Sequence, residues 1–172
     1  MDILYAPWRG EYVTKTARTR PTAMTSDECI FCAQFQEHND EKYYFLKRYQ
    51  HTVVMLNRHP YNAGHLMILP FEHIANLYDL SSETRNEIMA LTSYSSHVLQ
   101  KILGCQGINI GMNLGRAAGA GLPGHLHMHV LPRWEGDTNW LPLLGNTKQV
   151  SVDLDRLYKE LKPAFESHNF IN

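Results

Sequence analysis

Three histidines at alternate positions constrain the fold of this 172-residue chain more than any other feature. His125, His127 and His129 are separated by a leucine and a methionine, and further apolar residues follow. Successive side chains of an extended strand point to opposite faces, so the three imidazoles share one face and the apolar residues share the other. The pattern predicts a strand over 125–132 with an apolar back and a reactive or metal-binding front.

The remaining strand-like segments predict an antiparallel α+β domain. Residues 43–49 and 52–57 are two β-prone runs with a short polar break, which is typical of a hairpin. A third strand is expected over 65–69, where Pro70 stops it, and a fourth over 107–114. Segments of the βαβ type are scarce, so the pattern does not favour a doubly wound sheet.

Helical periodicity is clearest over residues 82–103, where apolar and small residues fall on one stripe. The stripe comprises Ile88, Leu91, Ser95, Val98 and Ile102. Ser81 or Ser82 is expected to cap the start of this helix, and Gly104 to close its end. A last helix is expected over 153–161.

Composition indicates a globular protein without a nucleic-acid or membrane partner. Sixteen basic and seventeen acidic residues leave a formal charge of −1, too small to attract a polyanion. No apolar run approaches the length of a membrane span, and residues 1–5 lack the features of a signal peptide. Three cysteines do not make a secreted disulfide framework, so we expect a reducing, cytoplasmic location. Residues 1–27 are expected to form an N-terminal extension and 28–172 a single domain.

The histidine strand has three chemical interpretations. The histidines could simply face solvent at a sheet edge, share a metal ion, or act in nucleophilic catalysis with one imidazole attacking and its neighbours transferring protons. The glycine-rich segment 115–124 precedes them, and small residues let backbone N–H groups approach an anion closely. This segment favours the third interpretation, with a phosphate in front of the histidines. It matches neither the dinucleotide-binding nor the P-loop motif.

Cys29 and Cys32 form a C-x-x-C pair that also has three interpretations. A redox pair would need a thioredoxin-like βαβ context, which the sequence lacks. The two residues could be unrelated buried cysteines, or they could be half of a zinc site that needs two further ligands.

The segment 125–131 matches in full the signature of the histidine triad (HIT) family, in which three histidines alternate with apolar residues and a second apolar residue closes the motif. The resemblance covers roughly residues 29–140 and extends to three further segments: 29–32, 57–70 and 132–140. Residues 4–9 and 133–140 resemble bacterial members near the diadenosine tetraphosphate phosphorylases. In place of the glutamine that other branches often carry in the glycine-rich loop, this chain has Ala120-Gly121.

The resemblance implies a five-stranded antiparallel sheet with one main helix and a C-terminal helix, paired into a ten-stranded sheet in a homodimer. It also implies cleavage at the α-phosphate of dinucleoside polyphosphates or adenylyl conjugates, with adenine favoured. His127 would form a nucleotidyl-histidine intermediate, His129 would contact the phosphate or leaving group and assist proton transfer, and His65 would support the triad. The nucleotide and its phosphates would meet Asn57, Asn113, Gly119, Ala120, Gly121 and His129.

HIT relatives that carry zinc indicate which residues would complete the zinc site here. Beyond the C-x-x-C pair, these relatives use the histidine after the third strand and the first triad histidine, which are His73 and His125 here. All four positions are filled, which favours a structural zinc that ties Cys29 and Cys32 to the histidine strand. No carboxylate cluster for magnesium is evident, so we expect no catalytic metal on the protein.

Several alternatives stay open at this point. A non-catalytic nucleotide-binding protein would keep the pocket without turnover, and a metal-dependent hydrolase would use all three triad histidines as ligands. Hydrolysis and phosphorolysis differ only in what attacks the intermediate, and the sequence favours neither. Trp134 and Trp140 could flank the active site or pack in the core or a dimer interface.

Overall fold

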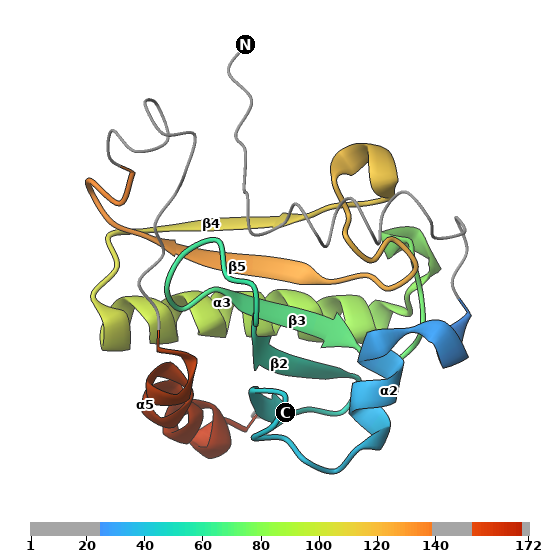
Figure 1. Cartoon of the computed structure of the whole chain (residues 1–172), viewed down its shortest axis with the longest axis horizontal. Helices are drawn as coiled ribbons and strands as arrows, with labels where there is room; N and C mark the ends of the chain where they lie inside the picture. The colour runs from blue at the N-terminus through green and yellow to red at the C-terminus, as the bar shows by residue number, and fades with distance from the viewer. Residues whose placement is uncertain (1–24, 139–152, 170–172) are drawn as a thin grey trace.

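The computed structural model describes residues 25–138 and 153–169, and its centre is a five-stranded sheet (Figure 1). The strands are β1 (Phe45–Arg48), β2 (Thr52–Leu56), β3 (Leu66–Pro70), β4 (Gly107–Met112) and β5 (Met128–Arg133). They lie in the order β1-β2-β3-β5-β4, and every neighbouring pair is antiparallel. The predicted antiparallel α+β architecture is therefore confirmed.

Helices precede β1, separate β3 from β4 and β4 from β5, and follow β5. The α-helices are α2 (Ile30–Gln36), α3 (Ser82–Leu103) and α5 (Leu154–Ser167). The 3₁₀ turns are η3 (Ser26–Glu28), η4 (Leu77–Asp79) and η5 (Arg116–Ala118). None of the helices among the described residues is long and apolar enough to cross a membrane.

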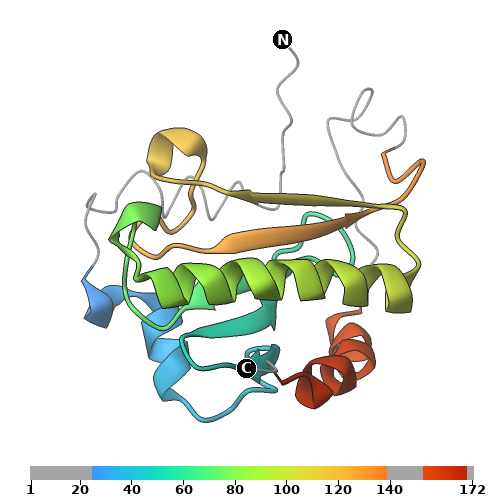
Figure 2. The ribbon, with the colours of Figure 1, turned by 180° about the vertical axis from the view of Figure 1, so that it is seen from behind.

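Helix α3 has the bounds that its capping residues predict. The Ser81 hydroxyl accepts a hydrogen bond from the backbone N–H of Thr84 at 3.1 Å, and Gly104 ends the helix with a φ of 64°. The buried side chains of the stripe, from Ile88 to Val98, cover one face of the sheet, and Figure 2 shows the helix lying across it. The apolar stripe, more than helix propensity alone, holds this helix in place.

The sheet separates two hydrophobic clusters. One lies between the sheet, α3 and α5, and includes Leu126, Met128 and Val130. The other lies on the opposite face beneath α2, where Phe31 packs against residues of β1, β2 and β3. The alternation of side chains around the histidines follows from this arrangement, because the apolar residues face the first cluster while the imidazoles face the α2 side.

The structure corrects the start of the fifth strand. The strand begins at Met128, not at His125, because the preceding backbone makes contacts outside the sheet. The N–H of His125 donates to the carbonyl of Leu122 at 3.3 Å, and the N–H of Leu126 donates to the carbonyl of Ile74 at 2.7 Å. The segment with the first two triad histidines is therefore an extended lead-in that is held by the chain after β3.

Two helices differ from the prediction. Helix α2 was not expected, and α5 runs to Ser167 although the sequence predicts an end near residue 161. Pro163 lies inside α5 and removes one backbone donor, yet the buried face with Leu161 and Phe165 continues past it. Burial of that face outweighs the lost hydrogen bond.

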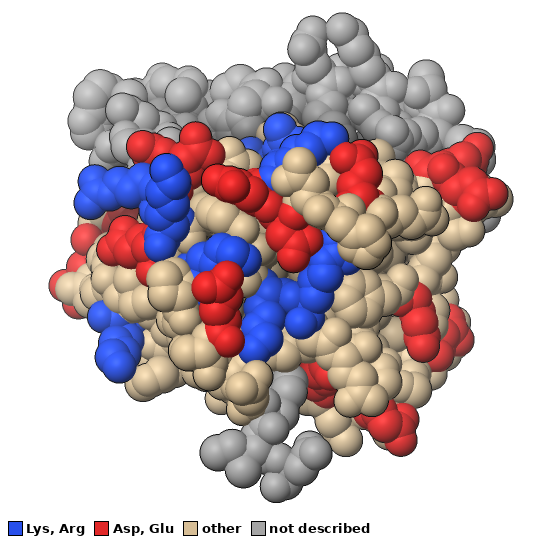
Figure 3. All heavy atoms as spheres, turned by 90° about the horizontal axis from the view of Figure 1, so that it is seen from below, with Lys and Arg blue, Asp and Glu red and all other residues tan. Residues whose placement is uncertain are grey.

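The face viewed in Figure 3 carries lysine and arginine side chains interspersed with aspartate and glutamate. Such mixing does not create the single-sign field that attracts nucleic acid. Trp134 is partly buried against the α3 cluster, whereas Trp140 lies outside the described residues.

Candidate functional site: a histidine-lined cavity beside a cysteine–histidine cluster

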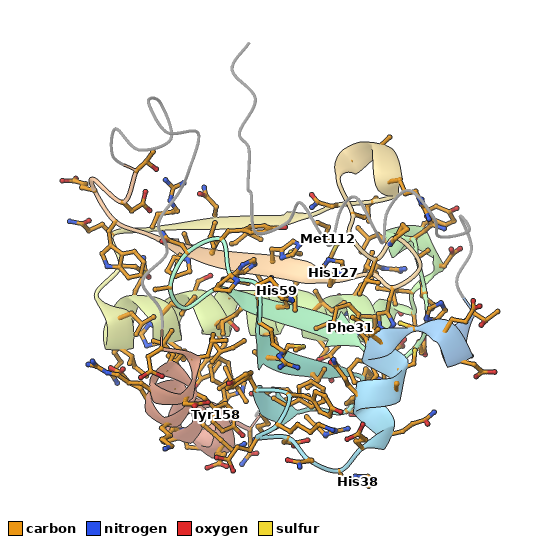
Figure 4. All side chains as sticks on the ribbon, in the orientation of Figure 1. Phe31, His38, His59, Met112, His127 and Tyr158 are labelled. Carbon is orange, nitrogen blue, oxygen red and sulfur yellow. The ribbon has the colours of Figure 1, made fainter. Side chains whose placement is uncertain are left out.

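A cavity of about 530 Å³ opens over the α2 face of the sheet. Five of the predicted site residues line it: Asn57, Asn113, Gly121, His127 and His129. The other lining residues are Ile30, Phe31, Gln34, Tyr44, Met55, Arg58, His59, Tyr61, Met67, Leu122 and Leu154. Figure 4 places His127 near Phe31, with His59 over the neighbouring strands. The volume and the apolar walls suit a small molecule such as a nucleotide.

The tautomer of His127 is set by the backbone. Its Nδ1 lies 2.9 Å from the carbonyl oxygen of His125, and since a carbonyl only accepts, Nδ1 carries the proton. Nε2 of the neutral ring therefore holds a lone pair. The side chain is buried, and burial lowers the pKa of the His127 imidazole below its ordinary value. The ring is thus uncharged at neutral pH and has one nitrogen available for attack.

A second chain of hydrogen bonds orients His129. The backbone N–H of Tyr61 donates to Nδ1 of His65 at 3.1 Å, so the proton of neutral His65 lies on Nε2. That Nε2 lies 2.9 Å from Nδ1 of His129 and donates to it, which leaves the proton of His129 on its own Nε2. The rings of His127 and His129 have centroids 4.8 Å apart. The two triad histidines at the cavity wall are therefore held in opposite tautomers.

Asn57 fixes the loop after β2. Its Oδ1 accepts from the backbone N–H of His59 at 2.8 Å, and its Nδ2 lies 3.4 Å from Nδ1 of His65. His65 itself is fully buried and lies behind His129, without lining the cavity.

The glycine-rich loop reaches the cavity at one of its three predicted residues. Gly121 lines the cavity, while Gly119 and Ala120 do not. The backbone N–H groups of Gly119 and Ala120 donate to the carbonyls of Arg116 and Gly115 inside the loop, at 2.9 and 3.2 Å. These two bonds shape the loop.

Four potential metal ligands converge next to this cavity. The ligand atoms of Cys29, Cys32, His73 and His125 all lie within 4.8 Å of one another. Nδ1 of His125 lies 3.4 Å from Sγ of Cys29 and 3.6 Å from Sγ of Cys32, and Nδ1 of His73 lies 3.4 Å from Sγ of Cys32. The group does not include His127 or His129.

The geometry of this cluster fits a tetrahedral ion. Zinc bond lengths of ~2.3 Å to sulfur and ~2.0 Å to nitrogen place sulfur and nitrogen about 3.5 Å apart in a tetrahedron. Nε2 of His125 lies 2.9 Å from the carbonyl oxygen of Pro70 and donates to it, so Nδ1 offers its lone pair to the cluster. Burial, reinforced by neighbouring Cys29, raises the pKa of the Cys32 thiol to about 11, and a bound cation would supply the charge that favours thiolates. The four residues could therefore hold a metal ion.

Comparison with known proteins decides the family. Residues 39–136 match the HIT domain family. The chain is also 33% identical over 150 residues to a protein named AP-4-A phosphorylase from Mycobacterium tuberculosis, with 87% of this chain and 77% of that protein covered. The chain belongs to the HIT family.

Other HIT relatives support the fold. An uncharacterised HIT-like protein from Methanocaldococcus jannaschii is 32% identical and covers 78% of this chain and 98% of its own length. The crystal structure of a Zn-bound histidine triad family protein from Mycobacterium smegmatis superposes with a TM-score of 0.67 at 25% identity, covering 83% of this chain and 96% of that one. The mycobacterial protein in that crystal structure is bound to zinc.

Sequence reasoning missed one wall of the cavity of this HIT protein. Ile30, Phe31 and Gln34 come from α2, which was not predicted although its residues belong to the resembling C-x-x-C segment. Gln34 lies three residues after Phe31 and four after Ile30, which is the spacing of a helix face, and this was the available signal. Tyr61 and Arg58 were missed because they lie on a turn whose shape depends on the buried His65.

Proposed function

We propose that this HIT protein transfers a nucleotidyl group from a dinucleoside polyphosphate or adenylyl conjugate through a covalent intermediate on His127. The observation that carries the proposal is the hydrogen bond from Nδ1 of His127 to the carbonyl of His125, which leaves Nε2 as a lone-pair nitrogen on a side chain that lines the cavity. A neutral nucleophile suits an anionic phosphate because it is not repelled by the phosphate oxygens. The name of the mycobacterial relative supports the substrate class.

The first step forms a bond between Nε2 of His127 and the α-phosphorus. The bond between that phosphorus and the bridging oxygen of the leaving group breaks, and the oxygen keeps the electron pair. His129 carries its proton on Nε2 and is placed to hydrogen-bond the phosphate oxygens or to protonate the departing oxygen. His65 acts through His129 as a positioning residue, because its own donor fixes the tautomer of that ring.

The second step regenerates the imidazole. Water or inorganic phosphate attacks the same phosphorus from the side that the leaving group has vacated, and the phosphorus–nitrogen bond breaks. A diadenosine tetraphosphate would give ATP in the first step and either AMP or ADP in the second. Among the predicted phosphate contacts, Asn113 and Gly121 line the cavity, so we assign them to the phosphates. Gly119 and Ala120 then support the loop with backbone donors that are engaged within it.

The cysteine–histidine cluster is proposed to hold a structural zinc ion. The ligands come from the start of α2, the segment after β3 and the lead-in to β5, so the ion would join three parts of the chain around the cavity. Because His125 belongs to the cluster while His127 and His129 do not, the three triad histidines are divided between two tasks. This division disfavours a hydrolase in which all three histidines bind one catalytic metal.

A homodimer with a continuous sheet remains our proposal for the assembly. Strand β4 is the outer strand beside β5, and Ile110 on it is 53% exposed. Helix α5 packs beside β1 at the other edge, which leaves β4 as the better edge for pairing with a second copy. Analytical ultracentrifugation that finds only monomers at micromolar concentration would refute this assembly.

Product analysis tests the proposed reaction. The protein is incubated with diadenosine tetraphosphate in water and in buffered inorganic phosphate, and nucleotides are separated by ion-exchange chromatography. AMP and ATP in water indicate a hydrolase, whereas ADP and ATP that form only with phosphate indicate a phosphorylase. Absence of turnover on diadenosine polyphosphates and adenylyl conjugates, with nucleotide binding retained, would instead support the non-catalytic alternative.

A further inference from the structure

Asn62 is a buried polar residue whose side-chain bonds lead away from its own loop. Its Nδ2 donates to the carbonyl oxygen of Pro132 at 3.1 Å and to Oδ2 of Asp137 at 2.9 Å, so both hydrogens of the amide are used. The two acceptors are 70 and 75 residues away in sequence, near the end of β5 and just after it. A buried amide that is satisfied in this way ties its loop to the end of the sheet.

Asp137 is a firm anchor for this amide. Its Oδ2 also accepts from Nε of Arg133 at 2.6 Å and from the backbone N–H of Trp134 at 3.2 Å, and its Oδ1 accepts from the second guanidinium arm of Arg133 at 2.8 Å. Bidentate pairs between arginine and a carboxylate are strong and have a fixed geometry. Asn62, Arg133 and Asp137 together are called the asparagine clamp below.

The asparagine clamp holds the turn that sets the protonation of His65. The carbonyl of Asn62 accepts from the backbone N–H of His65 at 3.2 Å, and Gly64 between them has a φ of 76°. Tyr61 lies between Asn62 and Pro60, whose ring restricts the backbone on the other side. The N–H of Tyr61 is thereby directed at Nδ1 of His65, at 3.1 Å.

An alternative arrangement of protons becomes available if this N–H moves away. Nδ1 of His65 could then carry the proton, and its Nε2 would accept from Nδ1 of His129 across the same 2.9 Å. Nε2 of His129 would be left with a lone pair and no proton for a leaving group. The other donor near Nδ1 of His65 is Nδ2 of Asn57, which is more distant at 3.4 Å. The contact from Tyr61 is therefore the one that decides between the two arrangements.

We propose that Asn62 is a positioning residue for the proton-donating histidine. By tying the turn to the end of β5, its amide selects the arrangement in which His129 carries its proton on Nε2. The use of that proton rests on the proposed function, whereas its location is a property of the protein without substrate. The effect on turnover is largest for a leaving group of high pKa, because such a group needs the proton most.

Nuclear magnetic resonance of the full chain, labelled in its histidine ring nitrogens, tests the location of the protons. The spectra are recorded without substrate at a pH where the rings are neutral. We expect the wild type to carry the protons of His65 and His129 on Nε2 and that of His127 on Nδ1. Asn62→Leu keeps the approximate volume and removes both donors, so His65 and His129 should shift toward protonation at Nδ1 while His127 stays unchanged.

Asn109→Leu is the matched control, because Asn109 also bonds to Arg133 but lies on β4. It should keep all three wild-type tautomers. Asn62→Ser, which keeps a single shorter donor, is the milder variant in case Asn62→Leu does not fold, and it should shift the same two rings in part.

A pair of aryl esters of AMP then tests the use of the proton. The p-nitrophenolate departs readily without protonation, whereas the unsubstituted phenolate does not. We expect Asn62→Leu to lower kcat for the phenyl ester roughly 10-fold more than for the p-nitrophenyl ester, which is part of the 10²–10⁴-fold that a general acid contributes. A merely structural role would lower both rates alike.

The outcomes separate the two proposals. A wild-type His129 protonated on Nδ1, or wild-type tautomers in the folded Asn62 variants, would overturn the role of Asn62. Equal losses on the two esters would overturn its link to proton transfer. Absence of turnover of either ester by the wild type, with the tautomers shifted in the Asn62 variants, would refute the proposed function and support the asparagine clamp.

Discussion

Loss of the proposed zinc ion is expected to lower the free energy of unfolding. The sulfur–nitrogen distances of 3.4–3.6 Å are already close to those of a tetrahedral zinc site, so little binding energy goes into rearrangement. The paired ligands are separated by 41 to 96 residues in sequence, which means that the unfolded chain cannot bind the ion with comparable affinity. Zinc at 100 to 1,000 times its Kd would then stabilise the folded state by about 2.7–4.1 kcal/mol.

For a chain of this size, that stabilisation corresponds to a fall in Tm of roughly 5–16 °C when zinc is removed. The assay is thermal unfolding followed by circular dichroism, with zinc-loaded protein in the presence and absence of a chelator. Cys29→Ser should lower Tm and abolish the response to the chelator. Cys105→Ala is the matched control, since Cys105 is also buried but lies outside the four-residue cluster. Cys105→Ala should lose some stability because the smaller side chain leaves a gap in the core, and its Tm should still respond fully to the chelator.

Turnover measured at a temperature well below both transitions separates a structural ion from a catalytic one. The protein from which the chelator has removed zinc should retain activity as long as it remains folded. If the chelator leaves the Tm of the zinc-loaded wild type unchanged, the proposal of a structural zinc is refuted. If the chelator abolishes activity without lowering Tm, the result supports a metal-dependent hydrolase instead.

Two further substitutions test how the fold positions the site. Gly64→Ala should lower the free energy of unfolding by roughly 1–3 kcal/mol, because Gly64 has a φ of 76° and a Cβ there would lie 2.5 Å from Cδ1 of Leu103. Gly104→Ala has a comparable φ and open space, so chemical denaturation should show the smaller loss for Gly104→Ala; equal losses would discount the clash. Asp137→Asn should cost roughly 1.5–3 kcal/mol near neutral pH, because Arg133 holds the pKa of that carboxyl well below its usual range. The stabilisation is complete above the ordinary carboxyl pKa and is lost on acidification, so Tm of the wild type should approach that of the variant below about pH 4; a constant difference would contradict this.

Local sequence signals determined α3 and much of the sheet. Ser81 and Gly104 provide a cap and a left-handed stop, and both are encoded by residues next to the helix they bound. The hairpin of β1 and β2 follows from two β-prone runs and a short turn. Side-chain alternation around the triad was also readable, because it needs only an extended backbone and an apolar neighbour on each side of His127.

Long-range contacts determined what the sequence did not show. The lead-in to β5 leaves the sheet because the N–H of Leu126 donates to Ile74, which is far away in sequence. Helix α2 has too few residues to display a clear period, and it is held by packing of Phe31 and Phe35 against the sheet. Helix α5 continues past Pro163 because Phe165 is fully buried, and a local rule against proline cannot register that burial.

In the candidate site, too, some features follow from the local sequence and others from long-range contacts. The triad and the C-x-x-C pair were evident in the sequence, and the structure brings His65 and His73 to them from separate segments. The tautomers of His127 and His129 depend on backbone groups of His125 and Tyr61, so only three-dimensional contacts assign them. The proton positions that the proposed chemistry needs are therefore a property of the fold more than of the motif.

The most direct test of the proposed chemistry is to trap the covalent intermediate. The protein is mixed with diadenosine tetraphosphate labelled in the α-phosphates, quenched in base within milliseconds to seconds, and digested for peptide mass spectrometry. We expect one adenylyl group attached to His127, stable in base and labile in acid as a phosphoramidate is, and absent from His127→Ala. A wild type that turns over the substrate while no adduct accumulates at any quench time, or an adduct on another residue, would contradict the assignment of His127 as the nucleophile.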